Sequence, residues 1–488
     1  MTSQISFVFD GRRVDLDVGS AERLTPTTTV LNFLRGLPSH TGTKEGCAEG
    51  DCGACTVVVA SAEEHHLVYR AVDSCLLFLP MLHRKQLITV ENLKTPGAAM
   101  HPAQEALVRL FGSQCGFCTP GIVMSLFALY KRRPPPAESE LRTLLAGNLC
   151  RCTGYKSILD AARWLVALDP MDQFSADEAR ILALLASIPR DSLELRSGLG
   201  QYYQPLTLQE GLVLRGRYPE TVIVNGASDV ALRVTKKHES LPAVLDLSAI
   251  DALRVITDRN GVLTVGAGVT MNALLSVVRD THQAIHSMLE VFGAQQIRNV
   301  ATVGGNLGTA SPVGDLLPLL IAYGASVRLE SVRGSRDIPA AEFVCGYRKT
   351  VCAPDELITA VAIPHLDRKA QVRAYKISRR RDLDIASVSG GFRIELDQGG
   401  CVENVTLAYG GMADRTKRAG QTETFLTGKP WNRRTVEQAM AVLEGDFAPI
   451  DDVRGSGLMR RVAARNLLLK FWTETNGMDR QEEGWNNS

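Results

Sequence analysis

The chain has 488 residues, 45% of them hydrophobic, and its 54 Lys and Arg residues nearly balance its 53 Asp and Glu residues. This length exceeds one ordinary domain, so we expect several folding units. The balanced charge, without a block of like charges, argues against nucleic-acid and polybasic membrane partners. The longest apolar runs are too short to span a bilayer and no secretory signal is evident, so we expect a cytoplasmic protein whose cysteines are thiols or metal ligands.

The chain begins with the pattern of a small mixed α/β domain, over residues 1–90. An alternating strand at 5–9, a turn at Asp10-Gly11 and a second alternating strand predict a hairpin, and a helix, two further strands and a short helix from Cys75 follow. Residues 91–167 have helical patterns broken by prolines and by glycine-bearing cysteine loops, which predict a compact helical domain.

The remaining two-thirds of the chain has a different pattern. Residues 168–200 have the character of a linker with one short helix. Residues 201–368 predict short strands and glycine-rich turns, one of them at 301–310, with helices between them. In residues 369–488, strands precede helices, which is typical of an α+β domain. The predicted fold class is therefore multidomain α/β and α+β.

The first set of cysteines is Cys47, Cys52, Cys55 and Cys75, spaced C-x4-C-x2-C-x19-C. This is the local spacing of plant-type [2Fe–2S] ferredoxins, in which a glycine-rich loop wraps the cluster. Buried free cysteines and a zinc site are the alternatives, although zinc loops usually carry C-x2-C twice.

The second set is Cys115 and Cys118 in QCGFCTPG with Cys150 and Cys152 in GNLCRCTGY. A C-x2-C pair alone is also typical of a redox pair or half a zinc site, but the C-x-C pair lets both thiolates bind one cluster. The two motifs resemble the helical [2Fe–2S] domain that follows a β-grasp ferredoxin domain in molybdenum hydroxylases of the xanthine oxidase family. The resemblance implies that Gln114 approaches the pterin of a partner domain; a helix-capping amide is the alternative.

Two glycine-bearing loops follow strands in the later part of the chain, VIVNGASDV and ATVGGNLGTASPVGD. Glycine lets backbone approach phosphate, although either loop alone is typical of a plain turn, and no Rossmann fingerprint accompanies them. Together with FGAQQIRNVATVGGN, GYRKT and KISRRRDLDIASV, the loops resemble the flavin domain of the same family across residues 200–480.

The resemblance implies an FAD site, residue by residue. The diphosphate and adenosine end would contact Val224, Asn225, Gly226, Ala227, Ser228, Asp229, Val230, Thr302, Val303, Gly304, Gly305 and Asn306, with Thr309 in the same loop. Phe292 would lie beside the isoalloxazine ring unless it is an ordinary core aromatic, Asp315 would hydrogen-bond the flavin, and Ile358 and Lys376 would line the site. Tyr347 would stand near the entry of NAD. Leu383 departs from the family, whose members often have a second acidic residue there, and the late cysteines Cys345, Cys352 and Cys401 are predicted to be structural thiols.

The resemblance also implies a function. Xanthine or hypoxanthine would be oxidised at molybdopterin-bound molybdenum on a large partner subunit, and electrons would pass through two [2Fe–2S] clusters to FAD and then to NAD+. Because the chain ends after its flavin domains, we expect a separate molybdenum subunit and a heterotetramer with two copies of each chain. No catalytic base or nucleophile is expected here. The alternatives are the equivalent subunit of an aldehyde, nicotine or aromatic-CoA oxidoreductase, and a non-enzymatic electron carrier or metal-binding module.

Overall fold

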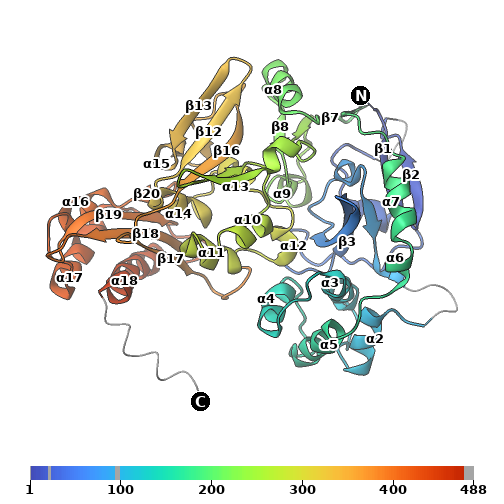
Figure 1. Cartoon of the computed structure of the whole chain (residues 1–488), viewed down its shortest axis with the longest axis horizontal. Coiled ribbons are helices and arrows are strands. Elements are labelled where there is room, and N and C mark those ends of the chain that lie inside the picture. The colour runs from blue at the N-terminus through green and yellow to red at the C-terminus, as the bar shows by residue number, and fades with distance from the viewer. Residues whose placement is uncertain (1, 20–23, 94–98, 477–488) are drawn as a thin grey trace. The chain divides into compact units, whose positions relative to one another are not determined.

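The computed structural model describes residues 2–19, 24–93 and 99–476, and the chain divides into two compact units (Figure 1). The first unit contains Met1–Asp251, Thr270–Asn272 and Gly293–Thr302. The second contains Ala252–Val269, Ala273–Phe292 and Val303–Ser488. Each unit is therefore built from segments that are distant in the sequence.

The first unit begins with a five-stranded sheet of spatial order β2-β1-β5-β3-β4. Its elements are β1 (Ile5–Phe9), β2 (Arg12–Leu16), α1 (Val30–Arg35), β3 (Thr56–Glu63), β4 (His66–Asp73) and β5 (Gln86–Ile88). Asp10 and Gly11 have φ of 50° and 70°, so the predicted β1–β2 hairpin is confirmed with a turn of two left-handed residues. The short helix expected from Cys75 is a 3-10 turn that begins at Leu79. The parallel β1–β5 pair between antiparallel neighbours agrees with the predicted ferredoxin-like domain.

Helices dominate the next segment, as the sequence predicts. They are α2 (Pro102–Arg109), α3 (Thr119–Lys131), α4 (Leu141–Leu145) and α5 (Lys156–Val166). α3 is apolar on nearly all sides because it packs against α2 and α5 as well as against β3 and β4 of the first sheet. The helices and the sheet therefore share one core, which includes Val58, Ile88, Leu126 and Phe127.

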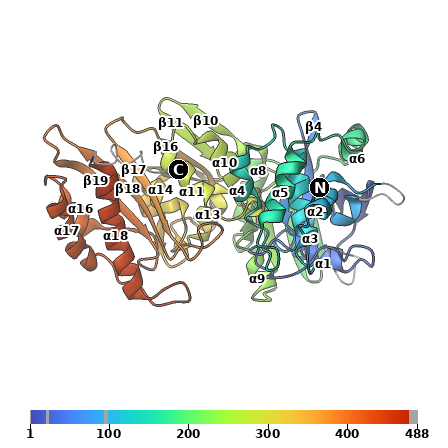
Figure 2. The same cartoon turned by 90° about the horizontal axis from the view of Figure 1, so that it is seen from below.

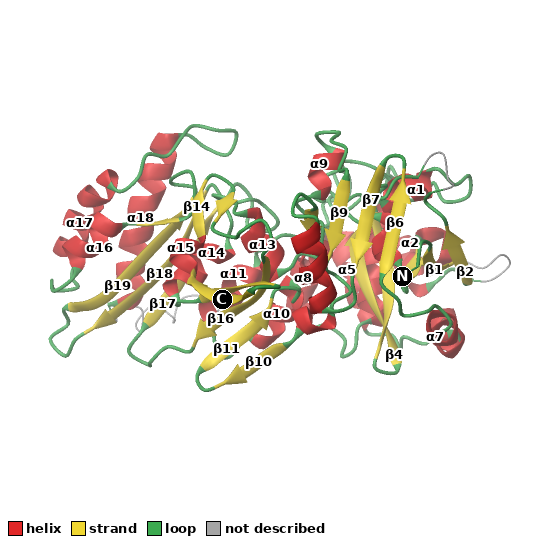
Figure 3. Ribbon diagram, turned by 90° about the horizontal axis from the view of Figure 1, so that it is seen from above, coloured by secondary structure: helices red, strands yellow, loops and turns green. Residues whose placement is uncertain are grey.

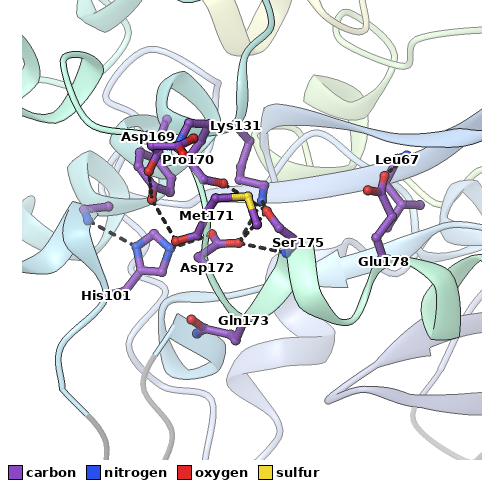
Figure 4. Close-up of polar contacts among 12 residues, drawn as sticks. Leu67, His101, Lys131, Asp169, Pro170, Met171, Asp172, Gln173, Ser175 and Glu178 are labelled. Carbon is purple, nitrogen blue, oxygen red and sulfur yellow. Dashed lines mark hydrogen bonds and ion pairs between the residues drawn. The ribbon is translucent and has the colours of Figure 1, made fainter.

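A buried ion cluster anchors the segment that the sequence predicts as a linker (Figure 4). Asp172, just before α6 (Gln173–Ala176), accepts hydrogen bonds from His101 Nε2 at 2.9 Å and from Lys131 Nζ at 2.8 Å, and all three side chains are buried. Burial would raise the pKa of Asp172, but the hydrogen bonds from His101 and Lys131 outweigh it and lower that pKa to about 2. The following helix α7 (Glu178–Ala186) packs on β1 and β4, so the linker is a structural part of the first unit.

A second, four-stranded sheet of order β6-β7-β9-β8 completes the first unit. Its strands are β6 (Leu193–Ser197), β7 (Gly200–Gln204), β8 (Val222–Val224) and β9 (Ala243–Asp246), accompanied by α8 (Leu208–Arg217) and α9 (Ala231–Thr235). β7, β9 and β8 are parallel, so their carboxyl ends meet at one edge. Helix α12 (Gln295–Arg298), from a distant part of the sequence, contacts β4 and α4.

The second unit contains an antiparallel sheet of order β10-β11-β16-β12-β13. Its strands are β10 (Ile256–Arg259), β11 (Val262–Gly266), β12 (Ser326–Ser331), β13 (Gly334–Pro339) and β16 (Leu357–Pro364). The second unit also contains the hairpin of β14 (Val344–Gly346) and β15 (Lys349–Thr350), and the helices α11 (Gln283–Glu290), α13 (Val303–Thr309), α14 (Leu316–Ala322) and α15 (Ala340–Phe343). Helix α10 (Met271–Val277) belongs to this unit from Ala273 onwards.

The prediction of a glycine-rich turn at 301–310 is wrong, because Val303–Thr309 form helix α13. Glycine and asparagine are weak helix formers, so the local sequence favours a turn. The helix is held from outside: the amides of Val303 and Gly304 donate to the carbonyls of Val269 and Ala267, at 3.0 and 2.8 Å. A Cβ on Gly304 would lie 2.6 Å from that of Ala267, so the glycine permits the close contact.

The C-terminal part of the second unit is the predicted α+β domain (Figures 2 and 3). Its elements are β17 (Gln371–Ile377), β18 (Val388–Leu396), β19 (Val402–Gly410), β20 (Lys417–Arg418), α16 (Gly420–Leu426), α17 (Arg433–Val442) and α18 (Gly457–Thr475). Alternation along β18 turns Gly391 towards α14 and the Phe392 ring towards Phe471 of α18. The sheet is thus covered on both faces. Among the helices in the described ranges, none is both long and apolar enough to cross a membrane.

Candidate cluster and flavin site

The β3–β4 ladder brings two cysteines of the first set together. Thr56 lies opposite Asp73 in the ladder, so Cys55, which precedes β3, comes beside Cys75, two residues beyond β4. Their Sγ atoms are 3.4 Å apart. Both the amide and the hydroxyl of Ser74 donate to the Cys55 carbonyl, at 3.3 and 2.7 Å, which fixes this corner.

The other two cysteines of the first set form a second pair in the preceding loop. A hydrogen bond from Cys52, helped by the backbone amides of Glu49 and Asp51, lowers the pKa of Cys47 to about 5 despite partial burial. The two amides lie 3.4 and 3.3 Å from Cys47 Sγ. A Cβ on Gly46 would lie 2.8 Å from Cys52 Sγ, so a glycine allows the loop to close around the sulfurs. Amides aimed at sulfur are the surroundings that an iron–sulfur cluster requires.

The second set also forms two pairs. Cys118 precedes α3, while Cys150 and Cys152 lie in the loop before α5. Burial, with a hydrogen bond to Cys150, raises the pKa of Cys118 to about 12. A hydrogen bond to Cys115 raises the pKa of Cys152. The Thr153 hydroxyl donates to Cys150 Sγ at 3.2 Å.

The pairing of the cysteines fits binuclear iron–sulfur clusters. A [2Fe–2S] cluster binds each of its two irons through two side chains, so it requires two neighbouring pairs of thiolates. Both cysteine sets supply such pairs. A single ion instead needs three or more ligands around one point, and the part of the chain that the structure describes holds no such group of His, Cys, Asp or Glu.

A buried amide network joins the two cysteine loops, and the sequence analysis did not identify it. The Cys52 carbonyl accepts a hydrogen bond from the amide of Leu149, the residue before Cys150, at 3.0 Å. The Asn148 side-chain amide donates to the Gly53 carbonyl at 3.0 Å. The side-chain nitrogen of Gln296 in α12 then shares its two hydrogens among Asn148 Oδ1, Thr56 Oγ1 and Ser125 Oγ, at 3.0, 3.2 and 3.2 Å. The only local signal was the position of Asn148 inside GNLCRC, whereas Gln296 is remote in sequence.

The candidate diphosphate loop of the first unit, 224–230, leaves β8 at the edge where the parallel strands end. Ligands of α/β sheets bind outside the carboxyl ends of strands. A Cβ on Gly226 would lie 1.7 Å from the Val300 carbonyl oxygen, so only glycine fits there. Ala227 has φ of 59° and begins the turn into α9, whose Ala231 amide donates to the Ala227 carbonyl at 2.7 Å.

The second unit brings together two of the predicted flavin residues. Asp315, just before α14, accepts a hydrogen bond from Lys376 of β17 at 2.7 Å, and their side chains are 7% and 6% exposed. Lys376 also donates to the Val291 carbonyl, next to the half-buried Phe292, at 3.0 Å. Burial raises the pKa of Asp315 although Lys376 opposes this. Asp315 Oδ1 is buried and finds no hydrogen-bond partner among the described residues, so the pair offers an acceptor to a polar ligand such as the flavin.

The remaining predicted residues occupy different surroundings. Ile358 of β16 lies close to α13: a Cβ added to Gly308 would be 3.5 Å from the Ile358 Cδ1 atom. Gly305 and Gly308 are exposed on α13, while Asn306 and Thr309 are half-buried. Tyr347 is 63% exposed in the β14–β15 hairpin. Cys345 is exposed, and Cys352 and Cys401 are partly buried. Leu383 has a left-handed φ of 70° in the loop between β17 and β18.

Family models match three successive stretches of the chain. They are a [2Fe-2S] binding domain at residues 89–163, an FAD binding domain in molybdopterin dehydrogenase at 195–366, and a CO dehydrogenase flavoprotein C-terminal domain at 373–475. The chain is therefore similar, in successive stretches, to a [2Fe-2S] binding domain, to the FAD binding domain of molybdopterin dehydrogenases and to a CO dehydrogenase flavoprotein domain.

Individual proteins are similar to larger parts of the chain. Xanthine dehydrogenase of Emericella nidulans is 34% identical over 91% of this chain and 36% of its own length. Aldehyde oxidase 2 of Mus musculus is 29% identical over 97% of this chain and 39% of its own length. A solved carbon monoxide dehydrogenase of Hydrogenophaga pseudoflava has 23% identity and a TM-score of 0.53, covering 55% of this chain and 94% of that one, which shows a shared fold. The chain spans about two fifths of the length of the curated relatives it matches.

Proposed function

We propose that this chain is the electron-transfer subunit of a xanthine dehydrogenase. Electrons from xanthine or hypoxanthine, oxidised at molybdenum on a large partner subunit, leave singly through two [2Fe–2S] clusters and reach NAD+ through FAD. FAD supplies the needed chemistry because it accepts single electrons and delivers a hydride. The observation that carries the proposal is the arrangement of eight cysteines as two neighbouring sets of pairs.

The cysteines have distinct roles in this proposal. Cys47 with Cys52 and Cys55 with Cys75 each hold one iron of the first cluster. The pairs Cys115–Cys152 and Cys118–Cys150 hold the second. The hydrogen bond between the Leu149 amide and the Cys52 carbonyl then offers a short covalent and hydrogen-bonded connection from one ligand set to the other.

The flavin residues divide between two tasks. The loop 224–230 and the segment 302–306 bind the diphosphate and adenosine end, and Gly226 and Gly304 allow these segments to pack closely against Val300 and Ala267. Asp315 and Lys376 orient the flavin, with Phe292, Thr309 and Ile358 as apolar or polar neighbours. Tyr347, on an exposed hairpin, stands near the docking place of NAD+.

The proposed substrate and partner rest on the relatives. Xanthine dehydrogenases reach 34% identity, which favours a purine, while the aldehyde oxidase at 29% supports an aldehyde as the second candidate. In the carbon monoxide dehydrogenase, the matched part is 94% of a chain of its own, which supports a molybdopterin subunit on a separate chain. For the assembly we propose a heterotetramer with two copies of each chain.

The division of labour can be tested by expressing the chain alone and together with its candidate large subunit. Because flavin and NAD residues both lie on this chain, the FAD-loaded chain alone should oxidise NADH with a dye as acceptor but leave xanthine unchanged. Addition of the large subunit should create xanthine-dependent NAD+ reduction. Xanthine oxidation by the chain alone would contradict the partner assignment, and failure to oxidise NADH would contradict the NAD assignment.

A further inference from the structure

Helix α9 connects the candidate diphosphate loop to the first cysteine loop. The loop 224–230 leads directly into α9, and the other end of the helix contacts the backbone of Cys47 and Ala48. The Thr235 hydroxyl donates to the Ala48 carbonyl at 2.7 Å, and Lys236 Nζ donates to the Cys47 carbonyl at 3.1 Å. All of these residues belong to the first unit. The cofactor roles implied by the family give no reason for these two contacts.

The Thr235 contact holds a strained turn. Ala48 has φ of 55°, a left-handed conformation that costs energy for a residue with a Cβ. This turn directs the amides of Glu49 and Asp51 to Cys47 Sγ. The Thr235 hydroxyl satisfies the carbonyl that the same turn exposes, so it stabilises the backbone geometry around a cluster ligand.

The Lys236 contact adds a positive charge to an acidic loop. Its ammonium lies 3.4 Å from Glu49 and donates to the Cys47 carbonyl, and the same loop carries a second acidic residue, Asp51, whose amide points to Cys47 Sγ. Reduction of a [2Fe–2S] cluster adds one electron from the reductant without making or breaking a bond. A fixed cation stabilises the added charge, and neighbouring carboxylates oppose it.

We propose that Thr235 and Lys236 are positioning residues of the first cluster, and that Lys236 raises its reduction potential. Helix α9 therefore acts at both ends, carrying the diphosphate loop at its start and supporting the Cys47 turn at its end. The inference rests on the proposed assignment of Cys47, Cys52, Cys55 and Cys75 to a cluster.

The charge effect is tested by redox titration of the complete complex, monitored by the paramagnetic signals of both clusters. Lys236→Met should lower the midpoint of the first cluster, changing its oxidised-to-reduced ratio at fixed potential by up to about tenfold, or about 59 mV for one electron. Lys237→Met is the matched control: it removes the same charge from a side chain that is 70% exposed and pairs only loosely with Glu239, at 3.8 Å. It should shift the midpoint much less, and the second cluster should stay unchanged.

The positioning effect is tested with Thr235→Val, which keeps size and charge but removes the hydroxyl. The variant should change the g-values of the first cluster and retain less iron per FAD, and Thr235→Ser should restore both. Equal shifts in the two lysine variants, or a Thr235→Val signal identical to wild type, would overturn this inference and leave the cluster assignment intact. A wild-type complex without a first-cluster signal would overturn the cluster assignment, and the inference with it.

Discussion

Single residues decide whether the candidate cofactor loops can form. Gly226 has no room for a Cβ beside the Val300 carbonyl, and Gly46 has none beside Cys52 Sγ. Asp315 and Lys376 neutralise each other in a buried position and still leave one carboxylate oxygen without a described partner. A buried acceptor without a described partner, held beside a lysine, is a place where a polar ligand can bind.

The tight contact at Gly226 gives a prediction at this scale. Gly226→Ala forces the diphosphate loop away from Val300, so the purified variant should contain less FAD per chain and unfold at lower temperature, with a loss of about 1–3 kcal/mol typical of overpacking. Flavin absorbance and thermal unfolding measure the two effects. Gly420→Ala is the control, because a Cβ there meets nothing within 4 Å. Full FAD content in Gly226→Ala would contradict the assignment of this loop.

At the scale of elements, buried polar groups rather than apolar contacts alone join the domains of the first unit. Asn148 and Gln296 connect two cysteine loops through one network, and Asp172 ties the segment before α6 to α2 and α3. Removing one member of such a buried polar group destabilises the fold by more than the net contribution of the group to stability, because the remaining partners are left unpaired.

The Asp172 cluster predicts a pH-dependent contribution to stability. The pKa of Asp172 is lowered to about 2 in the folded state, so its contribution is present above the ordinary aspartate pKa and is lost as pH falls towards 2. Asp172→Ala leaves Lys131 buried without its carboxylate and should cost about 3–5 kcal/mol at pH 7. Unfolding curves against pH measure this. The exposed neighbour Asp169 provides the control variant Asp169→Ala. An unchanged stability in Asp172→Ala would show that the ion cluster does not hold the segment.

Across the whole molecule, sequence patterns predicted elements that depend on residues close together in the sequence and missed those that depend on contacts between distant segments. Alternation and helical periodicity predicted the β1–β2 hairpin and α3, because their apolar faces repeat along the chain. Cysteine spacing placed Cys55 and Cys75 in one set without pairing them, and the β3–β4 ladder brings these two sulfurs together. Helix α13 was missed since its support comes from Val269 and Ala267, and Gln296 was missed since its partners are more than 140 residues away.

The central claim is that each cysteine set holds its own [2Fe–2S] cluster beside one FAD. The most direct measurement is the iron content and the paramagnetic spectrum of the reduced protein, compared with Cys150→Ser. We expect about four irons and one FAD per chain and two distinct [2Fe–2S] signals. In Cys150→Ser, the second-cluster signal should vanish while the first-cluster signal and the FAD remain. A single signal in the wild type, zinc in place of iron, or a Cys150→Ser variant with both signals intact would contradict the account.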